Sequence, residues 1–114
     1  MNDSATEPEP AYHLFLEQVE VSVSASALRL LISDEAHEPD IRRLAREVLA
    51  SLHDAPDGGV VTVPLSQGQL KITYSALRLL LNDLQREQAD EREVLRRVLD
   101  KLPDEHTIRA IKLE

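Results

Sequence analysis

The sequence contains no cysteine, which excludes several classes of protein at once. Without thiols the chain can form neither a disulfide framework nor a thiolate zinc site, and it has no cysteine nucleophile. Small secreted domains commonly depend on disulfides, so their absence favours a reducing compartment. We therefore expect a cytoplasmic protein.

Long apolar runs and aromatic side chains are also scarce. Apolar runs such as Leu30–Ile32 and Leu79–Leu81 are far shorter than the roughly 20 residues that cross a bilayer. No Lys or Arg precedes Arg29, so we expect neither a signal peptide nor membrane association. Two tyrosines and one phenylalanine are too few for a surface that stacks the bases of single-stranded nucleic acid.

The charge of the chain is acidic and unevenly distributed. Among 114 residues, 21 are acidic and 13 are basic, which gives a net charge of −8. Residues 1–57 hold twelve acids and four bases, whereas the remainder holds nine of each. Long-range repulsion therefore opposes binding to phosphate backbones and anionic lipids. Residues 1–10, rich in acid and proline, are expected to form a solvated tail.

An internal repeat organises the rest of the chain. Residues 16–34 (LEQVEVSVSASALRLLISD) align at an offset of 49 with residues 65–83 (LSQGQLKITYSALRLLLND), and both contain SALRLL. The similarity resumes at an offset of 50, between Glu47–Asp54 and Arg97–Asp104. This pattern predicts one α+β domain over residues 11–114, built from a duplicated strand–helix–helix unit (12–54 and 61–104). Helices would pack on a small antiparallel or mixed sheet.

Period-two alternation of apolar residues indicates the strands. Residues 12–16 and 61–65 alternate, and residues 19–23 and 70–72 alternate with the opposite parity. A change of parity requires a turn or a bulge. Ser66-Gln67-Gly68 suits a three-residue hairpin loop, whereas residues 17–19 lack the glycine and leave a bulged strand open. The topology is then ββαα-ββαα-β or βαα-βαα-β, closed by a strand at residues 107–113.

Helical periodicity follows each strand region. Ser24 or Ser26, and their repeat equivalents Thr73 or Ser75, are plausible N-caps of the first helices. Pro39 fits the first turn of a helix that carries the apolar stripe of residues 41–52. Residues 74–102 contain neither Pro nor Gly and could form one helix or two. Asp90 followed by Glu93 resembles a capping box and favours two.

The sequence predicts no catalytic, cofactor or metal site. The four histidines lack partners at metal-ligand spacing, and no nucleophile motif surrounds the serines. We therefore expect a protein that is not an enzyme and that needs no cofactor.

Two sets of residues recur in both repeats and are candidates for partner binding. Arg42 and Arg46 match Arg92 and Arg96, each pair at i, i+4 and off the apolar stripe. These arginines form either a solvated face with intrahelical ion pairs or a contact with a partner's acids or phosphates. Leu30 and Leu79 widen the apolar arc of the first helices. They are either buried within the chain or part of a subunit or partner interface.

Residues 45–81 resemble the front part of small excisionase-type antitoxins. In that family a helix leads through a glycine-containing turn into a short VTV strand and then into a helix-turn-helix. Val61-Thr62-Val63-Pro64 and residues 73–80 carry the resemblance. After Leu80 the sequence reads Asn82-Asp83-Leu84-Gln85 in place of the glycine-centred turn and the recognition helix. The resemblance therefore implies partner binding more than DNA reading.

Together these features predict a non-catalytic regulatory or protein-interaction module, with an antitoxin-like protein as one candidate, that binds another protein and itself as a homodimer. The alternative is a DNA-binding transcriptional regulator that uses the repeated arginines. A small-molecule-binding protein or enzyme is the third hypothesis.

Overall fold

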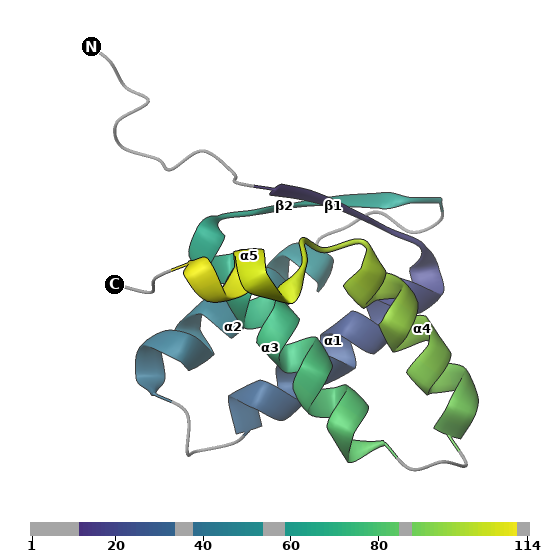
Figure 1. Cartoon of the computed structure of the whole chain (residues 1–114). Coiled ribbons are helices and arrows are strands. Elements are labelled where there is room, and N and C mark those ends of the chain that lie inside the picture. Colours follow the sequence, from purple (N-terminus) through teal and green to yellow (C-terminus); the bar gives the residue numbers. More distant parts are fainter. Residues whose placement is uncertain (1–11, 34–37, 54–58, 85–87, 112–114) are drawn as a thin grey trace.

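The computed structural model describes residues 12–33, 38–53, 59–84 and 88–111. The predicted tail at residues 1–10 lies outside them. Within these ranges the fold is α+β, as the sequence predicts, with five helices and a two-stranded sheet. In chain order the elements are β1 (Tyr12–Leu16), α1 (Gln18–Ser33), α2 (Pro39–His53), β2 (Val61–Leu65), α3 (Gln67–Asp83), α4 (Ala89–Asp100) and α5 (Glu105–Ala110) (Figure 1).

β1 and β2 form an antiparallel ribbon, which confirms the strands predicted at residues 12–16 and 61–65. The register pairs Leu14 with Val63 at the centre. Because side chains alternate across a strand, one face of the ribbon is buried and the other is exposed. The buried residues are Leu14, Leu16, Val61, Val63 and Leu65, and the exposed residues are His13, Phe15, Thr62 and Pro64.

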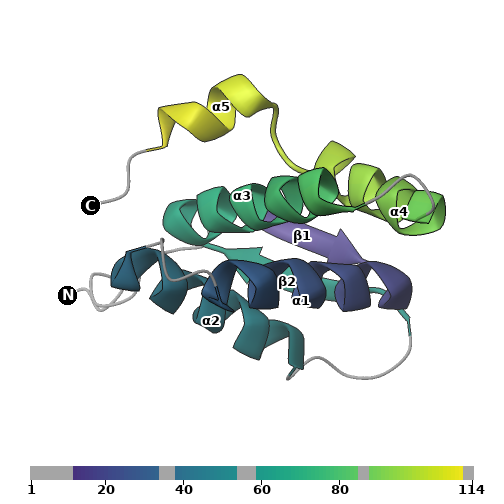
Figure 2. The same ribbon diagram turned by 90° about the horizontal axis from the view of Figure 1, so that it is seen from below.

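The helices lie on one side of the ribbon. α1 and α3 pack against each other, and α2 and α4 lie on opposite sides of this pair (Figures 1 and 2). α5 packs on α3, which connects the C-terminal part of the chain to the helical layer. The largest fully buried apolar side chains come from the ribbon and from α1, α3 and α4: Leu16, Leu28, Leu31, Val63, Leu65, Leu77, Leu95 and Val98.

The second pair of strands, predicted at residues 19–23 and 70–72, is wrong because both segments are helical. Before the second segment, Ser66 Oγ accepts a hydrogen bond from the Gln69 N–H at 3.2 Å, and Gln69 Oε1 accepts one from the Ser66 N–H at 3.0 Å. This capping box starts α3 where the sequence suggested a hairpin loop. The parity change therefore marks a strand that passes directly into a helix.

The first repeat makes the same transition without a serine cap. Glu17 N–H donates to Glu20 Oε1 at 2.8 Å, and α1 begins at Gln18 instead of continuing as a bulged strand. The N-caps expected at Ser24 or Ser26, and at Thr73 or Ser75, are also wrong, because all four residues lie inside α1 or α3. Ser24 and Thr73 are buried, and their hydroxyls have no hydrogen-bond partner among the described residues.

The breaks between helices follow the sequence more closely. α2 begins at Pro39, as predicted. α3 and α4 are separate helices, but the capping box expected at Asp90 is wrong because Gln88 is the N-cap of α4 and Asp90 lies in its first turn. In the first turn, the negative side chain of Asp90 interacts favourably with the positive end of the helix dipole.

The closing strand predicted at residues 107–113 is wrong, because residues 105–110 form α5. Asp104 caps this helix by accepting a hydrogen bond from the Thr107 N–H at 2.8 Å. Ile108 is buried inside α5, and Ile111 is buried at its C-cap. The last residues of the predicted strand, 112–113, lie outside the described ranges. Among the described helices, none is both long and apolar enough to cross a membrane.

Candidate functional site

The exposed large apolar side chains of the described residues all belong to the ribbon or its flanks. Phe15, Val19 and Val60 keep 54%, 48% and 63% of their surface accessible. Phe15 lies on the outward face of β1, Val19 lies in the first turn of α1, and Val60 directly precedes β2. We call these three residues the ribbon patch.

The register brings the members of the ribbon patch to one end of the ribbon. Leu16, next to Phe15, pairs with Val61, next to Val60. Gln18 Nε2 donates a hydrogen bond to Gly59 O at 3.1 Å, which holds the start of α1 beside the entry to β2. Gly59 has φ of +73°, a conformation that glycine adopts without strain. Phe15 and Val60, 45 positions apart in the chain, therefore lie at the same end of the ribbon.

The outer face of the ribbon carries no acidic side chain and no Lys or Arg. The sequences of the two strands are YHLFL and VTVPL. The ribbon patch is therefore flanked by the imidazole of His13, the hydroxyl of Thr62 and the ring of Pro64. Such a face attracts apolar contact, and it offers no cation for a phosphate.

Both edges of the ribbon are unsuited to receive a further strand. Pro64 pairs with His13 but lacks an N–H, so this pair is not hydrogen-bonded across the ribbon. Hydrogen-bonded and non-hydrogen-bonded pairs alternate in an antiparallel ladder, so the pair of Phe15 and Thr62 is not hydrogen-bonded either. The backbone N–H and C=O groups of these residues therefore point away from the partner strand. Lys101 Nζ donates to Phe15 O at 2.9 Å and occupies the β1 edge, whereas Pro64 removes a donor from the β2 edge. The outer face of the ribbon has neither obstacle.

An ion pair with a buried carboxylate lies next to the ribbon patch in α1. Glu20, next to Val19, is 1% exposed and accepts hydrogen bonds from Lys101 Nζ at 2.6 Å and from an Arg97 guanidinium nitrogen at 3.5 Å. The Tyr12 hydroxyl donates to the Lys101 carbonyl. Lys101 therefore joins the C-terminal end of α4 to β1 and to α1.

The surroundings of Glu20 favour its charged form. Burial alone would raise its pKa, but the hydrogen bonds from Lys101 and from the Glu17 N–H, with the charges of Lys101 and Arg97, outweigh burial and lower the pKa below its usual value. The carboxylate is ionised at neutral pH and serves as a fixed anchor. It does not have the raised pKa that a carboxylic acid needs to donate a proton near neutrality.

The structure does not bring the four candidate arginines together. Arg42 and Arg46 lie on α2, Arg92 and Arg96 lie on α4, and these helices flank opposite sides of the α1–α3 pair (Figure 1). Arg92 donates to the carbonyls of Leu81 and Leu84 at 3.3 Å, so it satisfies the C-terminal end of α3. Arg46 and Arg96 are exposed, whereas Arg42 is half-buried.

The two candidate leucines have similar exposure but different surroundings. Leu30 and Leu79 are both half-buried, so neither is fully enclosed within the chain. Leu79 packs against the core and lines a groove on α3, which is described below.

Within the described ranges, no group of His, Cys, Asp and Glu side chains is arranged to hold a metal ion. His53 contacts an Arg29 guanidinium nitrogen at 3.0 Å. His37 lies outside the described residues.

The sequence did not indicate the ribbon patch. The alternation at residues 19–23 predicts a half-buried strand that includes Val19, and the exposure of Phe15 and Val60 depends on a strand register that the sequence does not show. The signal that was available is the pair Ser66 and Gln69, which has the spacing of a capping box. This capping box predicts that a helix starts after Ser66. If the first repeat starts its helix at the equivalent position, Val19 lies in the first turn of that helix.

Comparisons with protein-family models, with curated proteins and with solved structures found no match.

Proposed function

We propose that the protein is a non-catalytic interaction module that docks another protein on the ribbon patch. The observation that carries the proposal is the gathering of Phe15, Val19 and Val60, all about half exposed, at one end of the ribbon. Contiguous apolar surface with a polar surround is typical of protein interaction sites. Since about half of each side chain is already buried, docking would gain roughly 1 kcal/mol for each one.

The charge of the chain favours one chemistry for the partner. The net charge is −8, and the exposed Glu17, between Phe15 and Val19 in the sequence, is paired with Arg97 at 3.4 Å, so the overall charge of the chain carries this inference. A partner surface with an apolar centre and a basic rim would therefore be steered towards the ribbon patch, and its on-rate would fall with added salt. The patch is smaller than the roughly 800 Å² that each partner buries in a stable interface, so a transient complex is expected unless the surrounding residues join the contact.

Site-specific crosslinking tests this proposal. A photoreactive phenylalanine analogue at position 15 should crosslink to one protein in the source cell, whereas the same analogue at Ser51, exposed on α2, should not. Adding Val60→Ser to the variant labelled at position 15 should reduce the yield at least tenfold, and adding Ser22→Ala, at an exposed position on α1, should not. Equal yields from positions 15 and 51, or a yield indifferent to Val60→Ser, would contradict the proposal.

We infer further that this protein regulates the partner that it binds, as an antitoxin regulates its toxin. The resemblance of residues 45–81 to the front part of excisionase-type antitoxins supports this role. A toxin reading frame beside the gene, whose product binds at the ribbon patch, is the expected finding.

A duplex-binding regulator is the alternative, because a two-stranded antiparallel ribbon has a shape that enters the major groove. Two observations weigh against it. The strands carry no Lys or Arg, and the repeated arginines lie on opposite sides of the helical layer.

We also propose that the two β-α-α segments are copies of one unit. The strand register supports this, because an offset of 49 converts the pair Tyr12–Leu65 into the pair Val61–Leu16. The capping contacts support it too, since Glu20 and Gln69 are 49 residues apart and each accepts from the N–H three residues earlier. An experimental structure in which residues 12–53 and 61–102 failed to superpose would remove this proposal.

A further inference from the structure

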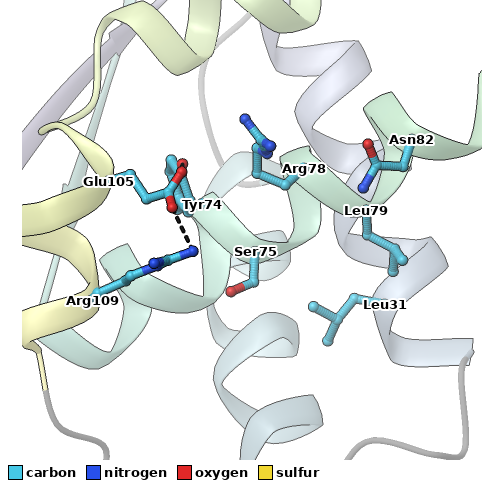
Figure 3. Close-up of a pocket in the computed structure, with 8 residues that line it drawn as sticks. All are labelled: Leu31, Tyr74, Ser75, Arg78, Leu79, Asn82, Glu105 and Arg109. Carbon is cyan, nitrogen blue, oxygen red and sulfur yellow. Dashed lines mark hydrogen bonds and ion pairs between the residues drawn. The ribbon is translucent and has the colours of Figure 1, made fainter.

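A groove lies where α3 meets α5 and the C-terminal half of α1. Its volume is about 390 Å³, within the range that holds small-molecule ligands. The groove and the ribbon patch have no residue in common. The lining side chains are Leu31, Tyr74, Ser75, Arg78, Leu79, Asn82, Glu105 and Arg109 (Figure 3).

The groove is divided into an apolar and a polar part. Leu31 and Leu79 lie close together at one end, and Ser75 lies between them and the α5 side chains (Figure 3). Leu31 is otherwise enclosed, with 1% of its surface exposed. Asn82 adds an amide next to Leu79. A ligand in this groove therefore meets aliphatic groups at one end and hydrogen-bonding groups along its wall.

The groove has a positive balance within an acidic protein. Arg109 pairs with Glu105 at 2.5 Å, and the Tyr74 hydroxyl donates to the same carboxylate at 3.4 Å. Arg78 has no hydrogen bond or ion pair with the residues that the structure describes, and it is exposed. Two guanidinium groups and one carboxylate leave one uncompensated positive charge.

We propose that this groove binds a small aliphatic carboxylate. One uncompensated guanidinium matches a monoanion, and its planar donors match a carboxylate in a bidentate arrangement. A phosphate dianion fits less well, because Glu105 would repel its second charge. Leu79, which is half-buried, then receives the aliphatic chain, and Ser75 and Asn82 can hydrogen-bond the carboxylate. This site goes beyond the proposed function, since it would bind a small molecule independently of the ribbon patch.

Titrations of the full-length protein, followed by amide chemical shifts in NMR, test the proposal with hexanoate, hexanol and inorganic phosphate as probes. Hexanoate should bind at least tenfold more tightly than hexanol, with the largest shifts in residues 74–82 and 105–109. Equal binding of hexanol, tighter binding of phosphate, or shifts confined to the ribbon would overturn the proposal.

The repeat supplies matched control variants. Arg78→Gln should remove the tenfold preference for hexanoate over hexanol, whereas Arg29→Gln, at the equivalent position of α1 outside the groove, should leave it unchanged. Leu79→Ala should weaken both probes, and Leu30→Ala should weaken neither. Circular dichroism of each variant shows that it is folded. An equal effect of Arg29→Gln and Arg78→Gln would mean that general electrostatics, not the groove, attracts the anion. Failure here would leave the crosslinking result at the ribbon patch unaffected.

Discussion

Glu20 is the residue on which the contact between α1 and α4 depends. Its carboxylate is 1% exposed, and its cationic partners Lys101 and Arg97 are only partly exposed. A buried charge is tolerated only while its partners remain, because an ion without them is costly to desolvate. In the second repeat the equivalent residue is Gln69, which makes the same capping bond and contacts Glu47 at 3.2 Å without any charge of its own.

Removing the cation should therefore destabilise the fold more than removing a surface ion pair. Lys101→Met is expected to lower the free energy of unfolding by about 2 kcal/mol, less than the 3–5 kcal/mol of a fully buried pair because the lysine side chain is 35% exposed. Arg43→Gln, which breaks an exposed pair with Glu47, should cost at most about 0.5 kcal/mol. Urea unfolding of both variants measures the difference. Equal costs would show that Glu20 does not need its partner.

Glu20 also predicts a pH dependence of stability. Because its pKa is lower in the folded protein than in the unfolded chain, the carboxylate contributes stability above the unfolded value of 4.5, and this contribution is lost as the pH falls through the folded pKa. The Glu20→Gln variant lacks this dependence. Urea unfolding between pH 7 and pH 3 should therefore show the two proteins converging in stability at acidic pH. Parallel stability curves would contradict this assignment.

At the scale of the elements, the apolar periodicity predicted the strands and the second helices but not the starts of the first helices. Residues 12–16 and 61–65 alternate over a half-buried ribbon, and the stripes of α2 and α4 repeat every 3.6 residues. Residues 19–23 alternate Val with polar residues, but the buried positions in the first turns of α1 are the polar Glu20 and Ser24, so the alternation does not mark the buried face. The ribbon patch was missed for the same reason, since it depends on where β1 ends and α1 begins.

The capping box at Ser66 makes this boundary testable. Ser66→Ala removes one of the two reciprocal capping bonds and should lower the free energy of unfolding by about 1 kcal/mol. Ser22→Ala, at an exposed position inside α1, should leave it unchanged or raise it slightly, since alanine is the better helix former. Thermal or urea unfolding distinguishes the two. A neutral Ser66→Ala variant would mean that packing alone fixes the start of α3.

At the scale of the whole molecule, the exposed ribbon patch predicts self-association. Without a partner, two copies can cover their apolar side chains by stacking the outer faces of their ribbons. Light scattering at micromolar concentration is expected to give a dimer mass for the native chain and a monomer mass for Phe15→Ser. A native monomer, or a Phe15→Ser variant that remains dimeric, would place the contact elsewhere or remove it.

The distribution of charge predicts weak binding to DNA. Each phosphate contact adds nearly one unit to the slope of affinity against salt, and only two of the four repeated arginines lie on each side of the molecule. We expect no gel shift of duplex DNA at about 150 mM salt. Any binding at low salt should disappear in Arg46→Gln plus Arg96→Gln, which spares the capping role of Arg92. A salt-resistant, sequence-dependent shift would favour the alternative function.

The proline in β2 affects how many copies of the chain can associate. A ribbon with two receptive edges could recruit copy after copy into an open-ended fibre, as amyloid-forming segments do. Pro64 on one side and Lys101 on the other hinder both routes, so the proposed dimer would form through the outer face, where a second ribbon covers the first and leaves no face for a third. Under this proposal, the chain would display apolar surface to a partner while its own association ends at two subunits.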